Sequence, residues 1–246
     1  MIQFFRKIRR SLLAEGKTGK YLKYALGEII LVVIGIIIAL QINNWNEERK
    51  TNQKQIVFLK EFKVSIENDL RNYDLQYGPR LLRKKSGLDS LMTYIHNKNE
   101  ISDSLFIKFY KQLGQGIRLG YDNGPYEALK SSGLDFIKND SLRTAINRTY
   151  TVLPFFQFFS HSMEDEYDSR IADLEYKILD HKPILNKDGT KAIDFKLKVT
   201  NIMSNQDFLW IYDLEQQKYY TYIFRMGQMK TALLDLKEKI EIELTK

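Results

Sequence analysis

Residues 24–42 read YALGEIILVVIGIIIALQI, and this stretch decides how the rest of the chain is organised. At 1.5 Å per residue it spans roughly 28 Å as a helix, close to the hydrocarbon thickness of a bilayer. By the same rise, Tyr24 and Trp45 bracket it about 31 Å apart, as aromatic side chains do at the two membrane interfaces. The sequence therefore predicts one transmembrane helix over residues 24–42, with Tyr24 and Trp45 as interfacial anchors.

Two other interpretations of this stretch are less favoured. Residues Ile29 to Leu40 are apolar without interruption, which would also suit a buried core helix or strand. The basic residues before the stretch and the aromatic bracket around it argue for a membrane helix instead. A cleavable signal peptide has a shorter apolar region and a small-residue cleavage site. Here the stretch leads into Gln-Ile-Asn-Asn-Trp, which fits no such site, so we expect the anchor to stay uncleaved.

Basic residues are distributed unevenly around the apolar stretch. Seven lie in residues 1–23 against a single acidic residue, whereas the fifteen residues that follow the stretch hold three: Arg49, Lys50 and Lys54. Because positive residues stay on the cytoplasmic side, we expect a basic amphipathic tail in the cytoplasm over residues 1–23. A simple topology signal without a defined helix explains the tail nearly as well. Residues 43–246 then form a periplasmic domain held at the cytoplasmic (inner) membrane by a single pass.

Charge and composition exclude several functional classes. The net charge of +7 belongs mainly to the tail, and residues 29–246 carry 31 basic and 29 acidic side chains. A domain so close to neutral has no electrostatic footprint for nucleic acid, so no nucleic-acid partner is expected. The chain has no cysteine, which excludes disulfides, thiolate metal sites and cysteine nucleophiles.

One face of the predicted membrane helix carries small residues and a carboxylate. Steps of 100° per residue place Glu28, Val32, Gly35 and Ala39 together. The pair Gly35 and Ala39 has the small-xxx-small spacing that lets a second helix approach closely. Ionisable residues inside a membrane are functional candidates by default. The alternative, which we favour slightly, is an ordinary lipid-facing surface with Glu28 reaching the headgroups.

Several motifs resemble those of a known family. The run from Gly27 to Glu47, GEIILVVIGIIIALQINNWNE, resembles the opening of a large family of uncharacterised single-pass envelope proteins of Bacteroidetes-type bacteria. The segments FFRKIR at residues 4–9 and YEALKSSG at residues 126–133, with Leu-Arg at 142–143, look similar too. That family is described as a domain of unknown function. The resemblance therefore implies a topology and supplies no chemistry.

After the membrane helix, apolar residues recur mostly at helical intervals. A stripe begins at Ile56 and is expected to end at Gly78-Pro79, and a long helix is expected from Asn139 towards Lys182, bent at Pro154. A coiled-coil seam is the clearest pattern: Tyr219, Tyr222, Met226, Met229, Leu233, Leu236 and Ile240. Residues 183–203 are the one strand-like stretch, expected as a connection with a short extended segment. The predicted fold is mainly α, an antiparallel helical bundle of long helices following the transmembrane helix.

An unusual aromatic cluster lies around the proline of the long helix. Its members are Tyr150, Phe155, Phe156, Phe158 and Phe159. Aromatic side chains on more than one face of a helix could line an apolar ligand pocket or a partner groove. The centre of the bundle core is the simpler interpretation, and the one that we favour.

Chemical sites are hard to find in this sequence. His161 with Glu164 and Asp165 forms at best half of a metal site, because no second cluster completes it. The glycines at 114, 116 and 120 lack the spacing and the preceding strand of a nucleotide-binding loop, so we interpret them as a helix end and a loop. We expect no catalytic residue, no cofactor and no metal.

The sequence therefore favours a non-enzymatic envelope protein that interacts or assembles through its helical domain and its membrane face. The expected partners are the lipid bilayer and a membrane or envelope protein, either a different protein or a second copy of the chain. A ligand-sensing helical module is the main alternative. The short tail leaves no room for an output domain, so a sensor would need a partner subunit. An envelope hydrolase with an unfamiliar site is a third class.

The charge asymmetry generates a direct test of topology. Alkaline phosphatase fused after residue 246 should be active, because the domain is expected outside the cytoplasmic membrane and the enzyme folds only there. A cytoplasmic reporter fused at the same place serves as the control. A silent phosphatase together with an active cytoplasmic reporter would reverse the orientation.

Overall fold

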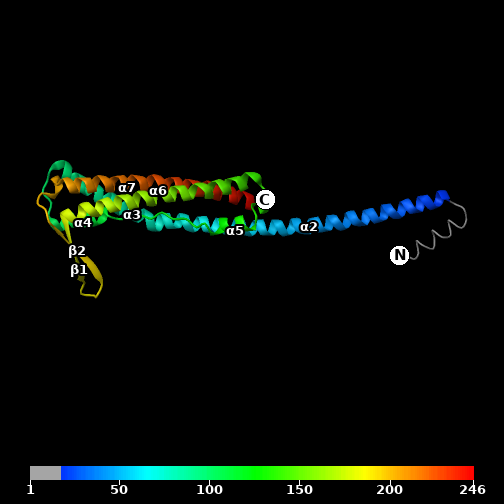
Figure 1. Ribbon diagram of the computed structural model, residues 1–246, viewed down its shortest axis with the longest axis horizontal. Coiled ribbons are helices and arrows are strands. Elements are labelled where there is room, and N and C mark those ends of the chain that lie inside the picture. Colours follow the sequence, from blue (N-terminus) through cyan, green and yellow to red (C-terminus); the bar gives the residue numbers. More distant parts are fainter. Residues whose placement is uncertain (1–17) are drawn as a thin grey trace. The chain divides into compact units, whose positions relative to one another are not determined.

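A computed structural model describes residues 18–246 of the chain, and Figure 1 shows its elements. The tail expected to be amphipathic lies mostly outside the described residues. The elements in chain order are α2 (Thr18–Asn72), the π-helical turn η1 (Tyr73–Tyr77), α3 (Gly78–Asn97), α4 (Asp103–Leu113), α5 (Gly124–Ser132), η2 (Leu134–Phe136), α6 (Asp140–Ile178), β1 (Leu179–Leu185), β2 (Lys191–Leu197), η3 (Ile202–Ser204) and α7 (Gln206–Leu244). The prediction of a mainly α chain is confirmed. The chain divides into two compact units after Ile56.

The first unit consists, over its described part, of α2 up to Ile56. Within the described residues, one helix is long and apolar enough to cross a membrane, and none of its most apolar window is buried. Large apolar side chains point outward all around it, including Leu31, Val33 and Ile36. A helix that is hydrophobic on every side is either deeply buried or a membrane span.

In the second unit, α2 continues into α3 instead of ending at Gly78-Pro79, where the sequence suggested a stop. Gly78 keeps helical backbone angles, and its N–H donates to Tyr73 O, five residues back. Pro79 has no N–H and would leave a gap in a regular helix. One π-helical turn just before the proline absorbs this irregularity, so the helix carries on.

Helices α6 and α7 run in opposite directions along each other. Lys177 contacts Asp207 and Lys218 contacts Asp168, while at the far end Asn139 donates to Glu243 at 2.8 Å. The predicted start of α6 is confirmed. Asn139 Oδ1 accepts from the N–H groups of the second and third residues after it, at 3.1 and 3.2 Å. Lys182 was the wrong end, because the chain leaves the helix after Ile178 to form β1.

The core consists of two clusters of buried side chains. One joins the end of α2, the segment 114–123, α5, α6 and most of α7, and the other joins α3, α4, the end of α6 and the start of α7. All the residues of the predicted α7 seam lie in or against these clusters: Tyr219, Tyr222, Met226, Met229, Leu233, Leu236 and Ile240. The seam predicted from spacing is therefore the buried face of α7.

Strands β1 and β2 form an antiparallel hairpin, which replaces the single extended segment expected between residues 183 and 203. Leu179 pairs with Leu197, His181 with Phe195, and Pro183 with Ile193. Gly189 occupies the left-handed region in the turn, with φ +80°. Figure 1 shows the hairpin leaving the end of the helices at a steep angle.

A buried carboxyl holds the segment 114–123 against α2. The backbone N–H of Asp122 donates to both oxygens of Asp69, at 2.9 and 3.1 Å. Ser65 Oγ donates to Asp122 Oδ2 at 2.8 Å. Burial raises the pKa of Asp69 to about 6, the N–H of Asp122 opposes this shift, and the negative charge of Asp122 adds to it. Asp69 is therefore harder to ionise in the folded chain than in the unfolded chain.

This shift predicts a pH-dependent stability. The folded carboxyl keeps its proton up to about pH 6, whereas in the unfolded chain it loses it near pH 3.8. The contribution of Asp69 to the free energy of unfolding is thus largest below pH 3.8 and falls as the pH rises to about 6. Asp69→Asn removes the titration, so the full chain's stability should change less between pH 4 and 7. Thermal unfolding in detergent, followed by circular dichroism, measures this, and identical pH profiles would contradict it.

Candidate functional site: an internal ion network and an exposed aromatic patch

Four charged side chains meet in the second unit, three of them buried and the fourth, Asp168, exposed. Lys84 of α3 is fully buried, and its Nζ contacts Glu215 of α7 and donates to Leu113 O at 2.5 Å. The same Glu215 oxygen lies 3.6 Å from Lys218 Nζ, and Lys218 contacts Asp168 of α6. Burial lowers the pKa of Lys84, and Glu215 opposes that shift. The network therefore links α3, α6, α7 and the end of α4 through ion pairs and one hydrogen bond.

A glycine allows α4 to come close enough to complete this network. A Cβ added at Gly87 would lie 2.8 Å from both Leu113 N and Phe109 O, which are backbone atoms that cannot move away easily. The absence of a side chain at Gly87 thus lets the last turn of α4 rest on α3. That contact brings the Leu113 carbonyl of α4 to Lys84, which lies one turn before Gly87 on α3.

A second polar cluster lies beside the network. Glu164 of α6 is buried, with Arg118 Nε 3.8 Å from its Oε2. A Cβ on Gly116 would meet Glu164 Oε1 at 2.8 Å, so the loop passes directly over the carboxylate. Burial raises the pKa of Tyr222, and Glu164 raises it further.

The suspected half of a metal site is thus engaged with the protein itself. His161 Nε2 lies 2.9 Å from Leu119 O, and Arg118 contacts both Glu164 and Asp165. Among residues 18–246, no group of three or more metal-binding side chains is placed to hold an ion. The glycines at 114 and 116 form the helix end and loop that their spacing suggested.

Sequence reasoning missed the ion network, although a signal was present. Counting back from Tyr222 in steps of four and three gives Lys218, Glu215, Ile211 and Phe208. The two charges therefore occupy core positions of the α7 seam. Lys84 likewise interrupts an apolar stripe between Leu81 and Leu88. A charge at a core position of a helix is the pattern that marks a buried ion pair.

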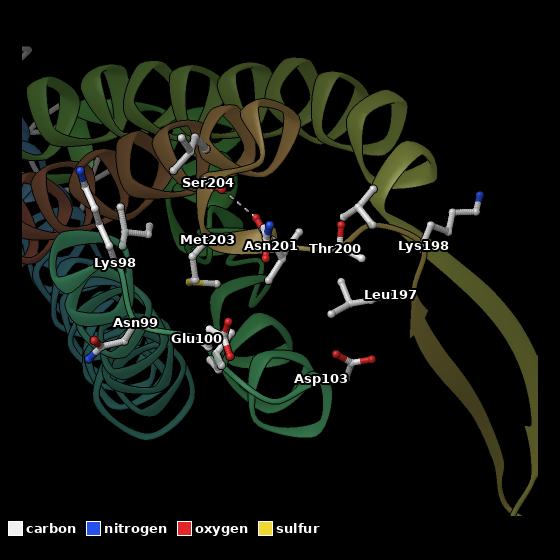
Figure 2. A pocket seen from close by; sticks show the side chains of 15 residues that line it. Lys98, Asn99, Glu100, Asp103, Leu197, Lys198, Thr200, Asn201, Met203 and Ser204 are labelled. Atoms are coloured by element: carbon white, nitrogen blue, oxygen red, sulfur yellow. Dashed lines mark hydrogen bonds between the residues drawn. The ribbon is translucent and has the colours of Figure 1, made fainter.

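A groove of about 960 Å³, which we call the end groove, opens where α3, α4 and the segment after β2 meet. Figure 2 shows the carboxylates of Glu100 and Asp103 on one side, facing Thr200 and Asn201. Asn201 adopts the left-handed backbone region, with φ 56°, and its carbonyl accepts from Ser204 Oγ at 3.1 Å. This groove contains none of the residues of the ion network.

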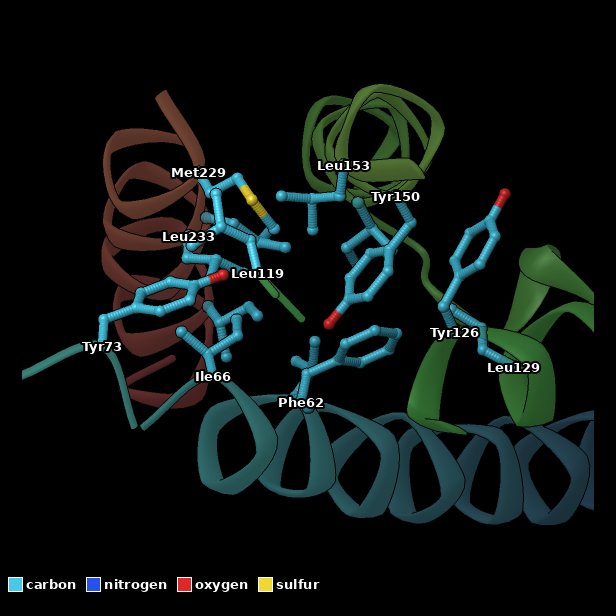
Figure 3. Close-up of a cluster of buried hydrophobic side chains, with 14 of the residues drawn as sticks. Phe62, Ile66, Tyr73, Leu119, Tyr126, Leu129, Tyr150, Leu153, Met229 and Leu233 are labelled. Atoms are coloured by element: carbon cyan, nitrogen blue, oxygen red, sulfur yellow. The ribbon is translucent and has the colours of Figure 1, made fainter. Parts of the chain in front are cut away.

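The aromatic cluster of α6 does not form the centre of the core, and that interpretation is wrong for three of its rings. Tyr150 is buried, stacked on Tyr126 with the ring centres 5.0 Å apart, and Figure 3 shows it among core side chains. Phe155, Phe158 and Phe159 are exposed. The helical repeat places them outside the face that packs on α7 and α2, which sequence spacing alone could not establish.

These rings belong to an exposed aromatic patch, which we define as Phe155, Phe156, Phe158, Phe159, Phe224 and Arg225. The Arg225 guanidinium of α7 lies 5.0 Å from the ring centre of Phe159 and 5.3 Å from that of Phe224. Its Nη1 donates to Gln228 Oε1 at 2.9 Å. Such cation–π contacts hold rings from two helices in one surface.

The patch continues into a side groove between α6 and α7, of about 940 Å³. Phe156 and Phe224 line this groove, together with Ile223 and the aliphatic Leu236. Charged residues line it as well, namely Arg148, Asp235 and Lys239. The surface thus combines exposed aromatic rings with an elongated cleft.

The candidate residues of the predicted membrane helix all lie within α2. Val32, Gly35 and Ala39 are exposed, Glu28 is half-exposed, and a Cβ on Gly35 would meet no atom within 4 Å. Trp45 is exposed, and the side chain of Tyr24 lies outside the described part of the chain. The small-residue face is therefore accessible to lipid or to another helix.

Removing one member of the ion network should destabilise the chain. Lys84→Met keeps the length of the side chain but leaves Glu215 with only Lys218, and breaking a buried pair costs about 3 kcal/mol. Denaturant unfolding of the full chain in detergent measures the loss. Lys85→Met is the matched control, since Lys85 pairs with Asp89 on the exposed side of the same helix. Equal effects of the two changes would contradict a role for the network.

Comparison with known proteins gives a family and no activity. A model of a family of unknown function, DUF6090, matches residues 28–212, from the apolar part of α2 to the start of α7. No curated protein matches the chain. No solved structure matches it either. Because the family model covers most of the sequence, the chain belongs to the family of unknown function DUF6090.

Proposed function

We propose that this chain is a membrane-anchored interaction module, in which an antiparallel helical bundle binds another membrane or envelope protein without catalysing a reaction. The observation that carries the proposal is the exposed aromatic patch with its adjoining side groove. Exposed apolar surface of this kind marks binding sites more often than chance, and aromatic and arginine side chains dominate binding energy at interfaces.

The anchor is supported by the surface of α2. Its apolar residues are exposed on all sides, so water would contact a continuous hydrocarbon cylinder, whereas a bilayer would cover it. The seven basic residues before the helix support an orientation with the amino terminus in the cytoplasm and the main domain in the periplasm. Glu28, Gly35 and Ala39 would then provide a second, intramembrane contact face.

The contacts made by the buried charges support a non-enzymatic role. Lys84 and Lys218 contact carboxylates of neighbouring helices, and Arg118 contacts Glu164 from the loop above. None of these groups lines the end groove or the side groove. The buried charges of Lys84, Glu215 and Lys218 are therefore engaged in contacts between helices, and neither groove gives a substrate a route to them.

A ligand-sensing module is the second candidate, favoured by the end groove of Figure 2. Its two sides come from the α3–α4 connection and from the segment after β2, and they include the left-handed residues Lys98 and Asn201. A ligand bound in the end groove would contact both the α3–α4 connection and the segment after β2. Signal output would still need a partner subunit.

A photo-crosslinking experiment tests the interaction surface. Benzoylphenylalanine at Phe158 of the full chain, in native membranes, should give a discrete adduct with a second protein. Leu82 on α3 is the matched control position, because its exposure of 69% is close to the 67% of Phe158 and it lies outside the patch. Phe155→Ser should weaken the adduct at position 158 by removing an adjacent ring. Equal adducts at both positions, or none, would contradict the proposal.

A further inference from the structure

The hairpin has two outer edges, and their backbone groups can be located from the hydrogen bonds at its ends. Asn186 N donates to Thr190 O, and Lys198 N donates to Ile178 O, both at 2.9 Å. In an antiparallel pair, hydrogen-bonded and non-hydrogen-bonded pairs alternate along the strands. The even-numbered residues therefore bond within the hairpin. The odd-numbered residues, Ile193 among them, direct their N–H and C=O groups outward.

The two edges differ because of one proline. On β1, the central outward-facing residue is Pro183, which has no N–H to offer. On β2, the corresponding residues are Lys191, Ile193 and Phe195, all of which have an N–H. Among the described residues, no backbone or side-chain hydrogen bond to Ile193 is formed from outside the hairpin. The β2 edge is thus an open template for another strand, whereas the β1 edge is interrupted.

The hairpin also has an apolar side that the helices cover only at its base. Leu179 is buried, and Phe195 is half-buried beneath Lys111, whose Nζ lies 4.8 Å from the ring centre. Towards the turn, Leu185 and Ile193 on the same side are 72% and 49% exposed. A two-stranded hairpin is at best marginally stable in water, and added strands stabilise it.

We propose that the β2 edge pairs with the β2 edge of a second copy of this chain, antiparallel and two-fold symmetric about Ile193. The result is a four-stranded sheet, β1-β2-β2-β1, with the apolar sides of both hairpins on the same face. This pairing deepens the proposed interaction role by naming a second copy as a partner, and it uses a surface separate from the aromatic patch. A shared membrane would raise the local concentration of the two copies.

Charge along β2 supports a second copy and sets the register. With the two-fold at Ile193, Asp194 faces Ala192 of the other copy, and Lys191 faces Phe195, so no like charges oppose each other. Shifting the two-fold to Asp194 would place two carboxylates directly opposite, which is destabilising. Ile193 is also the most exposed apolar side chain of β2, so the chosen register buries the surface that is bare in one copy.

Disulfide formation tests this pairing cleanly, because the chain contains no cysteine. In the full chain in native membranes, Ile193→Cys should give a disulfide-linked dimer on mild oxidation. A hydrogen-bonded antiparallel pair has a Cα separation of about 5.5 Å, inside the range that disulfides bridge. Leu185→Cys is the matched control. It is more exposed, but the two copies of this residue would lie roughly 20 Å apart, three strand spacings across the sheet and four residues along it, and should not link.

A second change separates strand pairing from chance collision. Lys191→Pro removes an outward N–H at the first residue of β2, where proline is tolerated, and should abolish the dimer formed by Ile193→Cys. Lys191→Thr keeps the N–H and should leave that dimer intact. Together these results would support the pairing.

Other results would overturn the pairing. Equal linkage from Ile193→Cys and Leu185→Cys, or linkage unaffected by Lys191→Pro, would refute strand pairing. A disulfide adduct with a different protein would identify an extended segment of that protein as the occupant, in place of a second copy. The photo-adduct at Phe158 should persist in Lys191→Pro, so failure of this pairing and failure of the proposed function give different patterns.

Discussion

Lys84 carries an ammonium group into the space between α3, α4 and α7, where water cannot reach it. A charge in that position is tolerated only when its partners arrive together, because an unpaired buried charge costs several kcal/mol. Glu215 comes from α7, and the Leu113 carbonyl comes from the last turn of α4. Correct packing of these helices is therefore coupled to one electrostatic condition. An arrangement that displaces α7 relative to α3 would separate Lys84 from Glu215.

The same condition accounts for the division of the core. On one side of the network, α7 packs through aliphatic residues such as Leu233 and Ile240 against α2. On the other side, Phe208 and Ile211 pack against α3 and α4. Packing between aliphatic surfaces depends mainly on volume and pattern, so it specifies the register of two helices only weakly. The charged layer between the two clusters adds the register that the apolar contacts lack.

Periodicity predicted most helices and the buried side of α7, because spacing of three and four is a local property. It also predicted the start of α6, since a polar Asn139 before a helical stripe is a capping pattern. The exposed rings of Phe155 and Phe158 could not be predicted, because which face of α6 is covered depends on α7 and α2, which are distant in sequence. The hairpin was only partly visible. Its first half, from Leu179 to Lys182, reads as a continuation of the helix.

Pro183 has a consequence for how far the chain can assemble. A sheet edge that is free on both strands can recruit copy after copy, and the product is an open fibre. This hairpin has one usable edge, on β2, and an interrupted edge on β1. Once the β2 edge is occupied, the outer strands of the combined sheet are both β1, each with a proline at its centre. Growth by strand addition would then end with a closed pair, and a hairpin that could seed aggregation becomes self-limiting.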